Sequence, residues 1–407
     1  MGGVARHLMH VFEDPTLTFA DLRAMVHGIV DYDIKSFEKI DGCNIFFTID
    51  QHTLQPMFVR SATDIRNGFL GTHAMRSKFA GHPAEVIFLG AVEDITAHCA
   101  NMSTLAASLF MHEGKQVFVN CEIVIKETTR LITYDKDVIA FHNLHVLEDM
   151  KMKKIDEPQL LSDIVDTFES QEQHTFEFTG PLVLKFKNCK LKADFDRSLR
   201  AFLSARKLTY DNTIGDYVFK NAYTQEMKFW SISQATKHDI AKRVVNPDTG
   251  KSILEIKKRV RGDKLRKRIS GLCTKQNAPK TYKRCAKDLI DLIDEFAIKL
   301  LSSDNVSSEL VINSQAASDT AKKKVVDCIE LIRCTRDGWH KQRKSLLFEH
   351  NDQRMTDYIN SSVGFSVEGI VFEFKGNAYK LTGLFAKANQ IYGLAGIGRG
   401  KIPPISR

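Results

Sequence analysis

The feature that most constrains the fold is a long helical block that lies between two strand-rich parts of the chain. Short apolar or alternating runs, separated by polar or glycine-containing turns, dominate residues 1–150 and predict strands. These runs are GCNIFFTID, QPMFVRSA, AEVIFLGAV, QVFVNCEIVI and DVIAFHNLHVL. Strand character returns near residue 363 in FSVEGIVFEFKGNAYKLTGLF, where KGN predicts a turn. We expect both strand-rich parts to belong to one sheet domain.

Helical periodicity marks the N-terminal region and the middle of the chain. TFADLRAMVHGIV has apolar residues at helical spacing, and ITAHCANMSTLAASLFMHEG predicts a second helix. From about residue 190 the pattern becomes long, charged and helical, with an apolar stripe at Val325, Ile329 and Ile332. The sequence therefore predicts an α+β fold of antiparallel sheets with helices. Residues 1–190 and 361–407 form this domain, and residues 191–360 form a helical insertion.

The positive charge of the chain is concentrated in the insertion. The formal net charge is +8, whereas residues 251–287 carry fourteen Lys or Arg against Glu255 and Asp263. Such a field suits phosphate contact, so we expect this block to bind nucleic acid; a solvated helix pair is the alternative. Because Tyr282 is its single aromatic residue, recognition of the backbone or of a duplex is expected rather than base stacking.

Nothing in the sequence predicts a membrane protein or a secreted one. No apolar run approaches the roughly 20 residues that span a bilayer, and the N-terminus lacks the charged-then-apolar pattern of a signal peptide. The eight cysteines include no Cys-x-x-Cys pair, which favours reduced thiols. We therefore expect a cytoplasmic protein without membrane contact.

A lysine between two acidic residues stands at the head of the first predicted strand, in SFEKIDGCNIFF. Alone, its Lys-x-Asp-Gly tetrapeptide is consistent with a strand-edge lysine beside a turn. Six pieces follow one another in order: KIDGCN at 39, FVRSA at 58, FVNCEIV at 118, DVIAFHNLH at 137, EGIVFEF at 368 and YKLTG at 379. Together they resemble the covalent nucleotidyltransferase superfamily of polynucleotide ligases and capping enzymes. The resemblance covers the two strand-rich parts and omits the helical block.

The resemblance implies that Lys39 attacks the α-phosphate of a nucleoside triphosphate and holds the nucleotide through a phosphoramide bond. An ordinary lysine, with a pKa near 10.4, is protonated at neutral pH and has no free lone pair. Burial by Ile40, Ile45 and Phe46, together with cations around the phosphates, would lower that pKa. Asp41 opposes this effect, so we expect it to orient the turn.

Details of the lysine element point to one branch of the superfamily. EKIDGCN is similar to the second family of phage RNA ligases, because Asn44 stands where DNA ligases and capping enzymes usually have arginine. By that resemblance Glu38 accepts a hydrogen bond from the adenine amino group, and Asn44 contacts the sugar or a phosphate. Asp41 replaces that family's usual histidine. Gly42 is expected to let the backbone and a phosphate approach closely.

The next elements supply further nucleotide contacts in the resemblance. Arg60 would hold the nucleotide and the RNA end, and Glu122 would accept a ribose hydroxyl or help to place a metal ion. Phe141 would stack on the base. His142 and His145 follow it as an exposed pair, and strand alternation predicts one of them on each face of the sheet.

The last two elements concern the phosphates. Glu368 matches the carboxylate that positions Mg²⁺, an ion that prefers oxygen ligands and keeps most of its waters. Lys380 is the first choice for a cation that neutralises the α-phosphate in the transition state. Thr382 occupies the place of a frequent second lysine, so Lys387 could substitute for it.

The sequence thus favours an ATP-dependent polynucleotide ligase that uses Mg²⁺ and acts on RNA in preference to DNA. The short stretch after YKLTG leaves no room for the C-terminal OB domain of DNA ligases and capping enzymes, which agrees with this expectation. Two alternatives remain at this stage. One is a capping-type guanylyltransferase or another nucleotidyl transferase, and the other is a non-catalytic nucleic-acid-binding protein with a ligase-like fold.

Overall fold

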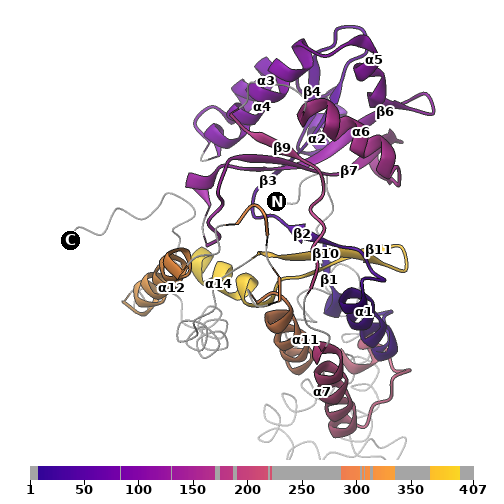
Figure 1. Ribbon diagram of the computed structural model, residues 1–407, viewed down its shortest axis with the longest axis vertical. Coiled ribbons are helices and arrows are strands. Elements are labelled where there is room, and N and C mark those ends of the chain that lie inside the picture. The colour runs from indigo at the N-terminus through magenta and orange to yellow at the C-terminus, as the bar shows by residue number, and fades with distance from the viewer. Residues whose placement is uncertain are drawn as a thin grey trace, which may run out of the picture. The chain divides into compact units, whose positions relative to one another are not determined.

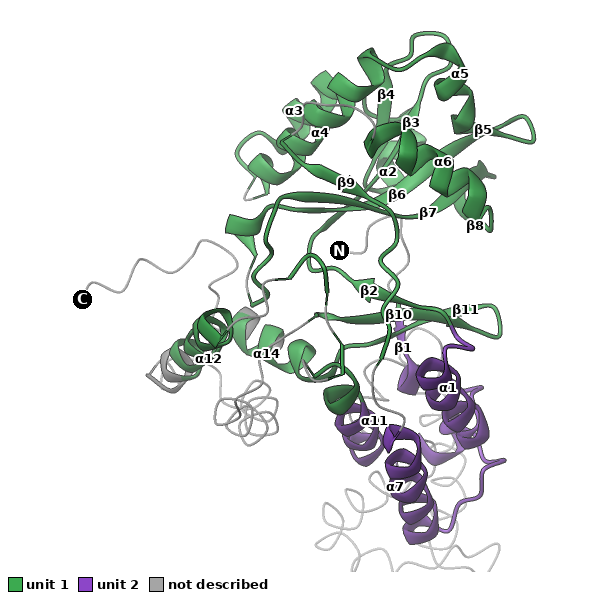
Figure 2. Cartoon of the chain, in the orientation of Figure 1, with its two compact units in different colours: residues 1–8, 35–188, 297–407 green, residues 9–34, 189–296 purple. Residues whose placement is uncertain are grey.

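The computed structural model describes residues 8–82, 84–129, 131–169, 175–186, 190–218, 221, 286–302, 305–306, 308–311, 315–334 and 367–394 (Figure 1). The chain divides into two compact units (Figure 2). Unit 1 contains residues 1–8, 35–188 and 297–407, and unit 2 contains residues 9–34 and 189–296. The N-terminal helix thus belongs with the helical unit, and the chain after residue 296 returns to unit 1. The predicted α+β class is confirmed.

The larger sheet of unit 1 is formed by the strands predicted in the first part of the chain. Its central order is β4-β3-β6-β7-β8, with antiparallel neighbours, while β5 pairs with β6 and β9 runs parallel to β7. The strands are β3 (Cys43–Ile49), β4 (Pro56–Val59), β5 (Met111–His112), β6 (Lys115–Val124), β7 (Val138–Glu148), β8 (Lys151–Ile155) and β9 (Glu177–Thr179).

Helices and a short 3₁₀ turn cover one face of this sheet (Figure 1). The core between them contains the fully buried rings of Phe47, Phe88, Phe141 and Phe168. The helices on this face are α3 (Thr72–Phe79), α4 (Glu85–Ala100), α5 (Thr104–Ala107) and α6 (Pro158–Glu169), with the 3₁₀ turn Ser108–Phe110. Helix α2 (Ala62–Arg66) lies against the opposite face, where its Ile65 packs with Phe46, Val59 and Phe118. A further 3₁₀ turn, Lys126–Thr128, contributes no buried residue.

Two sequence predictions in this region are wrong. The run AEVIFLGAV, predicted as a strand, forms the first half of α4, whose buried residues Phe88, Ala91, Val92 and Ile95 follow helical spacing. A short apolar run does not separate a buried strand from a buried helix by periodicity alone. The single helix predicted over residues 95–114 is instead the end of α4, then α5, a 3₁₀ turn and β5.

A smaller sheet in unit 1 joins the two distant strand-rich parts. It contains β2 (Ser36–Lys39), β10 (Gly369–Phe374) and β11 (Asn377–Leu381) in the order β11-β10-β2, with antiparallel neighbours. The predicted KGN turn is present: Lys375 and Gly376 both have positive φ, at 50° and 73°, as a two-residue hairpin turn requires. Residue 39 therefore lies beside residue 369.

Two helices of unit 1 complete the core around this sheet. The predicted stripe residues Val325 and Ile329 on α12 (Gln315–Cys334) are buried with Phe385 and Ile391 on α14 (Gly383–Leu394). This cluster also contains Ile40, the residue after Lys39. The C-terminal helices thus help to bury the segment that carries the lysine.

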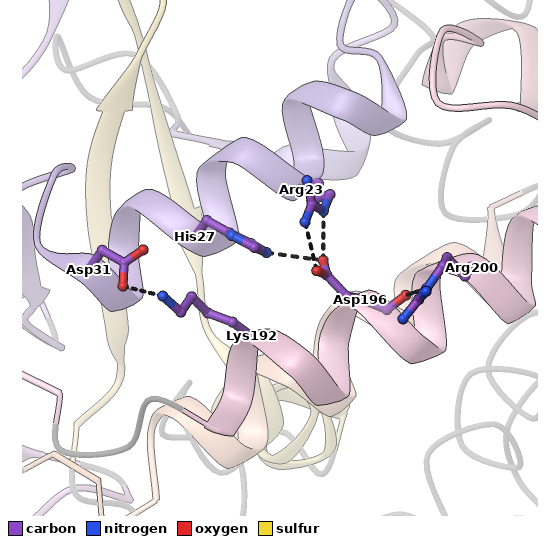
Figure 3. A network of polar contacts seen from close by, with 6 residues as sticks. All are labelled: Arg23, His27, Asp31, Lys192, Asp196 and Arg200. Carbon is purple, nitrogen blue, oxygen red and sulfur yellow. Dashed lines mark hydrogen bonds and ion pairs between the residues drawn. The ribbon is translucent and has the colours of Figure 1, made fainter.

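Unit 2 is helical in its described part, apart from β1 (Met9–His10) and a 3₁₀ turn (Val11–Glu13). Its helices include α1 (Phe19–Asp31), α7 (Lys190–Arg206) and the first part of α11 (Lys287–Leu300), and residues 214–218 are also helical. Figure 3 shows polar contacts between α1 and α7: Asp196 accepts hydrogen bonds from Arg23 at 2.8 Å and contacts His27 Nε2 at 3.0 Å. These contacts fix the register of the two helices.

Two further expectations concern membrane-spanning helices and the basic block at residues 251–287. Within the described ranges, no helix combines the length and the apolar character needed to cross a membrane. The basic block at residues 251–287 lies outside the described residues, apart from 286 and 287. Its predicted contact with nucleic acid stays a prediction.

Candidate active site

The centre of the site is the ion pair between Lys39 Nζ and Glu368 Oε1. Lys39 is the last residue of β2 and is paired with Gly369, the first residue of β10, so the strand register brings the backbone of Glu368 next to that of Lys39 where the two strands end. Their side chains are only 22% and 9% exposed. The second oxygen of Glu368, Oε2, is buried without a hydrogen-bond partner among the described residues.

Gly42 brings the second carboxylate, Glu122, to this pair. A Cβ atom at Gly42 would lie 2.5 Å from the Ile123 carbonyl oxygen and 2.8 Å from Glu122 Cγ, so only glycine fits against β6 here. The close approach expected of Gly42 is thus made to the protein's own backbone. Glu122 also pairs in register with Asn44 of β3, whose Nδ2 donates to Glu122 Oε2 at 3.3 Å.

The electrostatics of the cluster correct one expectation. Burial lowers the pKa of Lys39, but the carboxylates of Glu368, Glu122 and Asp41 outweigh burial, so this pKa stands above its ordinary value. In the absence of a nucleotide the amine is therefore an ammonium ion. Burial raises the pKa of Glu122 to about 7 and that of Glu368 to about 8, although Lys39 opposes both shifts. The cluster can take up or release protons near neutral pH.

Asn44 and Arg60 form the edge of the site on β3 and β4. Besides Glu122, the Asn44 amide donates to Asn120 Oδ1 at 2.7 Å and to the Cys121 carbonyl at 3.1 Å. Arg60 Nη1 donates to the Asn44 carbonyl at 2.7 Å, and its guanidinium lies 4.3 Å from the centre of the Phe88 ring. The positive charge of Arg60 lowers the pKa of Glu122 in part. Both predicted residues therefore lie near the lysine.

Phe141, predicted to stack on the base, lies instead in the hydrophobic core with Phe47, Phe168 and Phe178 and is fully buried. The reason is strand alternation: Phe141 pairs with Cys121, a core residue, whereas Glu122 pairs with Ala140 on the opposite face. The prediction for Phe141 is wrong, since its ring has no open face for a base.

A β-bulge in β7 places the imidazole ring of His142, in place of the Phe141 ring, near Lys39. The β6–β7 register changes from Asn120–Asn143 to Cys121–Phe141, which leaves His142 as the extra residue on β7. Burial and the charge of Lys39 lower the pKa of His142 to about 4, so the imidazole is neutral at pH 7 and lies near the lysine. The expectation of one histidine on each face is also wrong, because the bulge breaks the alternation: His145 contacts Phe46, on the same face as Asn44.

Glu38, the residue before Lys39, is another buried carboxylate. It is 2% exposed, and burial raises its pKa to about 7. Ser308 Oγ donates to Glu38 Oε2 at 2.6 Å, whereas Glu38 Oε1 has no partner among the described residues. Sequence reasoning missed Ser308, since it lies within the predicted insertion and has no motif around it.

Tyr134 connects this carboxylate with the lysine loop. Its hydroxyl accepts a hydrogen bond from the Asp41 amide at 2.9 Å. Burial raises the Tyr134 pKa well above its ordinary range, and the charges of Glu38, Asp41 and Glu368 add to the shift. The hydroxyl thus lies close to both the Glu38 carboxylate and the Lys39–Glu368 pair.

The two predicted phosphate-binding lysines follow β10. Lys380 of β11 pairs with Val371, and Val371 pairs on its other side with Phe37, so alternation puts Lys380 on the same sheet face as Lys39. Lys387 lies on α14. Both are nearly buried, at 7% and 6% exposure.

The carboxylates fit a magnesium ion only with help from other ligands. Within the described part of the chain, no group of three or more His, Cys, Asp or Glu side chains is arranged to hold a metal. Glu368 and Glu122 offer hard oxygen ligands, and Glu368 Oε2 is unpartnered. This suits Mg²⁺, which binds through one or two carboxylates plus waters and substrate phosphates.

The chain matches no protein-family model, and no curated protein matches it.

Proposed function

We propose that this protein is an ATP-dependent polynucleotide ligase that becomes adenylated on Lys39 and acts on RNA in preference to DNA. The observation that carries the proposal is the buried Lys39–Glu368 pair with Glu122 beside it, built from segments at opposite ends of the chain. One ammonium cannot balance the three carboxylates of Glu368, Glu122 and Asp41, so the cluster holds unbalanced negative charge, which is costly to bury. Strongly perturbed groups of this kind cluster at active sites.

The reaction has three steps. In the first, the lone pair of the neutral Lys39 amine forms a P–N bond with the α-phosphorus of ATP, and the bond to the bridging oxygen breaks, so pyrophosphate leaves with that electron pair. In the second, an oxygen of a 5′-phosphate attacks the same phosphorus, the P–N bond breaks and Lys39 regains its amine. In the third, a 3′-hydroxyl attacks the activated 5′-phosphate, AMP leaves and a phosphodiester forms.

The residues of the site suit these steps. The Lys39 ammonium must lose a proton before it attacks, and Glu368, whose pKa is about 8, is in contact with it and can accept that proton. Lys380, on the same sheet face, can neutralise the α-phosphate as charge develops. A bound Mg²⁺, held by Glu368 and Glu122, would supply Lewis-acid stabilisation of the phosphate oxygens.

The proposal is tested by incubating the protein with α-labelled ATP or GTP and Mg²⁺. We expect an acid-labile, alkali-stable protein adduct with ATP that disappears in Lys39→Ala. Lys35→Ala is a matched control, because Lys35 is an exposed lysine just before the same strand. A chase with 5′-phosphorylated RNA or DNA then shows which end accepts AMP. A wild-type protein that never carries a label from either nucleotide refutes the proposal, and a label from GTP alone favours a capping-type enzyme.

A further inference from the structure

The Glu38 carboxylate has two oxygens in different situations. Oε2 accepts a hydrogen bond from Ser308 Oγ at 2.6 Å, whereas Oε1 is buried and has no partner among the described residues. A buried acceptor without a donor is unfavourable, by roughly 1–3 kcal/mol. Such an atom, one residue away from the proposed nucleophile, is expected to receive a donor when the nucleotide binds.

The direction of the Ser308 hydrogen bond is fixed by a second contact. Ser308 Oγ accepts from the Leu310 amide at 3.0 Å, so the hydroxyl proton is left to point at Glu38. The segment itself is anchored to the protein: the Asp135 amide donates to the Leu310 carbonyl at 3.0 Å, and Val311 forms a bridge with Tyr134. Ser308 is thus a firmly placed donor rather than a rotating surface hydroxyl.

A carboxylate with both oxygens available is a good partner for guanine, whose ring N–H and amino group can donate to the two oxygens side by side. The Ser308 hydrogen bond takes up one lone pair of Oε2 and holds the carboxylate in place, which leaves Oε1 as the oxygen without a partner among the described residues. A single acceptor suits the 6-amino group of adenine, while guanine presents an oxygen at that position. The Ser308 contact therefore competes with the side-by-side pairing that guanine would make.

We infer that Ser308 is a positioning residue for purine selection: it occupies Glu38 Oε2 and leaves Oε1 to accept a hydrogen bond from the amino group of adenine. The inference rests on the proposed function, because it assumes that a nucleoside triphosphate binds beside Lys39. It adds a residue from the segment after the helical unit to the specificity of the site.

The test compares adduct formation with ATP and with GTP, each over a range of concentrations. We expect Ser308→Ala to lower the preference for ATP over GTP about tenfold, because Oε2 becomes available to guanine. Ser308→Thr keeps the hydroxyl and should retain the preference. Ser77→Ala is the matched control, since Ser77 is an exposed serine on α3 that bonds only to the His73 carbonyl. An unchanged ratio in folded Ser308→Ala overturns the inference.

Two further measurements distinguish a failure of the Ser308 inference from a failure of the proposed ligase function. Equilibrium binding of labelled ATP and GTP to the same variants gives the base preference without covalent chemistry. If wild type binds ATP selectively but forms no adduct, the ligase proposal fails while a loss of selectivity in Ser308→Ala still supports the role of Ser308. If Ser308→Ala does not fold, Ser308→Cys, which has similar size and a weaker donor, replaces it and is judged by the same ratio.

Discussion

Gly369 lies opposite Lys39 across the antiparallel pair of β10 and β2, and the residue before this glycine is the ion-pair partner of the lysine. The register of two strands from distant parts of the chain thus decides where the proposed nucleophile finds its counter-ion. The carboxylates of Glu368, Glu122 and Asp41 each raise the pKa of the Lys39 amine, so in the proposed reaction the loss of this proton would control when attack can begin.

Replacement of Glu368 should change the pH dependence of adduct formation. In the wild type the rate should rise with pH, because only the neutral amine attacks and the Lys39 pKa lies above its ordinary value. Glu368→Gln removes the main carboxylate that raises this pKa, so the rising limb should move to lower pH even though the maximal rate falls. The measurement is the initial rate of labelling from pH 6 to about 10.

Glu373→Gln is the control for that experiment. Glu373 lies on the same strand, but its side chain is 54% exposed and pairs with Lys154. Its replacement should leave the pH profile where it is. A profile of Glu368→Gln that stays in place, or moves to higher pH, would contradict the assigned role of Glu368.

The buried carboxyl groups should make the protein less stable as the pH rises from about 4.5 to about 8. Burial raises the pKa of Glu122 from 4.5 to about 7 and that of Glu368 from 4.5 to about 8, so the folded state binds these protons more tightly than the unfolded state. Their contribution to stability is complete below the unfolded pKa and is lost as the pH passes the folded pKa. Glu122→Gln should reduce the loss by on the order of 2 kcal/mol.

Thermal unfolding across this pH range measures the effect. Glu148→Gln serves as the control: hydrogen bonds from Lys115 and Lys153 lower the pKa of Glu148 to about 2, so this group is ionised throughout the range. Its variant should show the same slope as wild type. An equal slope in Glu122→Gln would mean that Glu122 is not held in the buried environment described above.

Gly42 should tolerate no side chain. In Gly42→Ala the new methyl group would lie 2.5 Å from the Ile123 carbonyl oxygen, so β3 and β6 must separate. We expect a loss of about 1–3 kcal/mol in the free energy of unfolding and a weaker adduct, since Glu122 moves away from Lys39. Chemical denaturation measures the first effect. Gly71→Ala is the control, because a methyl group there meets no atom within 4 Å; equal stability of both variants would be the contrary result.

Phe141 and His142 should separate stability from activity. Phe141→Ala leaves a cavity among aromatic rings and should cost about 3–5 kcal/mol of stability. His142→Ala should lower the thermal midpoint less than Phe141→Ala does and slow labelling about tenfold or more, because the imidazole lies near Lys39. Unfolding and labelling of both variants are compared side by side. The opposite pattern, a stable Phe141→Ala that no longer binds ATP, would restore the original prediction for Phe141.

Several elements of the fold could be predicted because their sequence patterns are local. The hairpin of β10 and β11 follows from alternation around a glycine turn, and α1 follows from the helical spacing of its apolar residues. The strand predicted at residues 84–92 failed because a short apolar run has the same composition in a strand as in a helix, and here only Phe88, Ala91 and Val92 are buried, at helical spacing. Tertiary packing decided between them.

For the site, the order of the motifs predicted that Lys39, Glu122 and Glu368 belong to one site. The contacts and protonation of these residues depend on neighbours that the sequence alone does not identify. Because of a bulge on β7, His142 and not Phe141 lies on the face of the sheet that carries the site. No residue type in the sequence predicts this bulge. Ser308 reaches Glu38 only through the folded backbone of a segment far along the chain. The charge of Lys39 also depends on how many carboxylates surround it, which becomes known only in three dimensions.

The smaller sheet has a consequence for the order of events during synthesis. Strand β2 leaves the ribosome before β10, its antiparallel neighbour, because β10 follows far along the sequence. Until β10 has paired with β2, Lys39 lacks its ion-pair partner Glu368. Under the proposed function, a growing chain would therefore carry no finished nucleotide site, and the topology itself would prevent premature reaction with ATP.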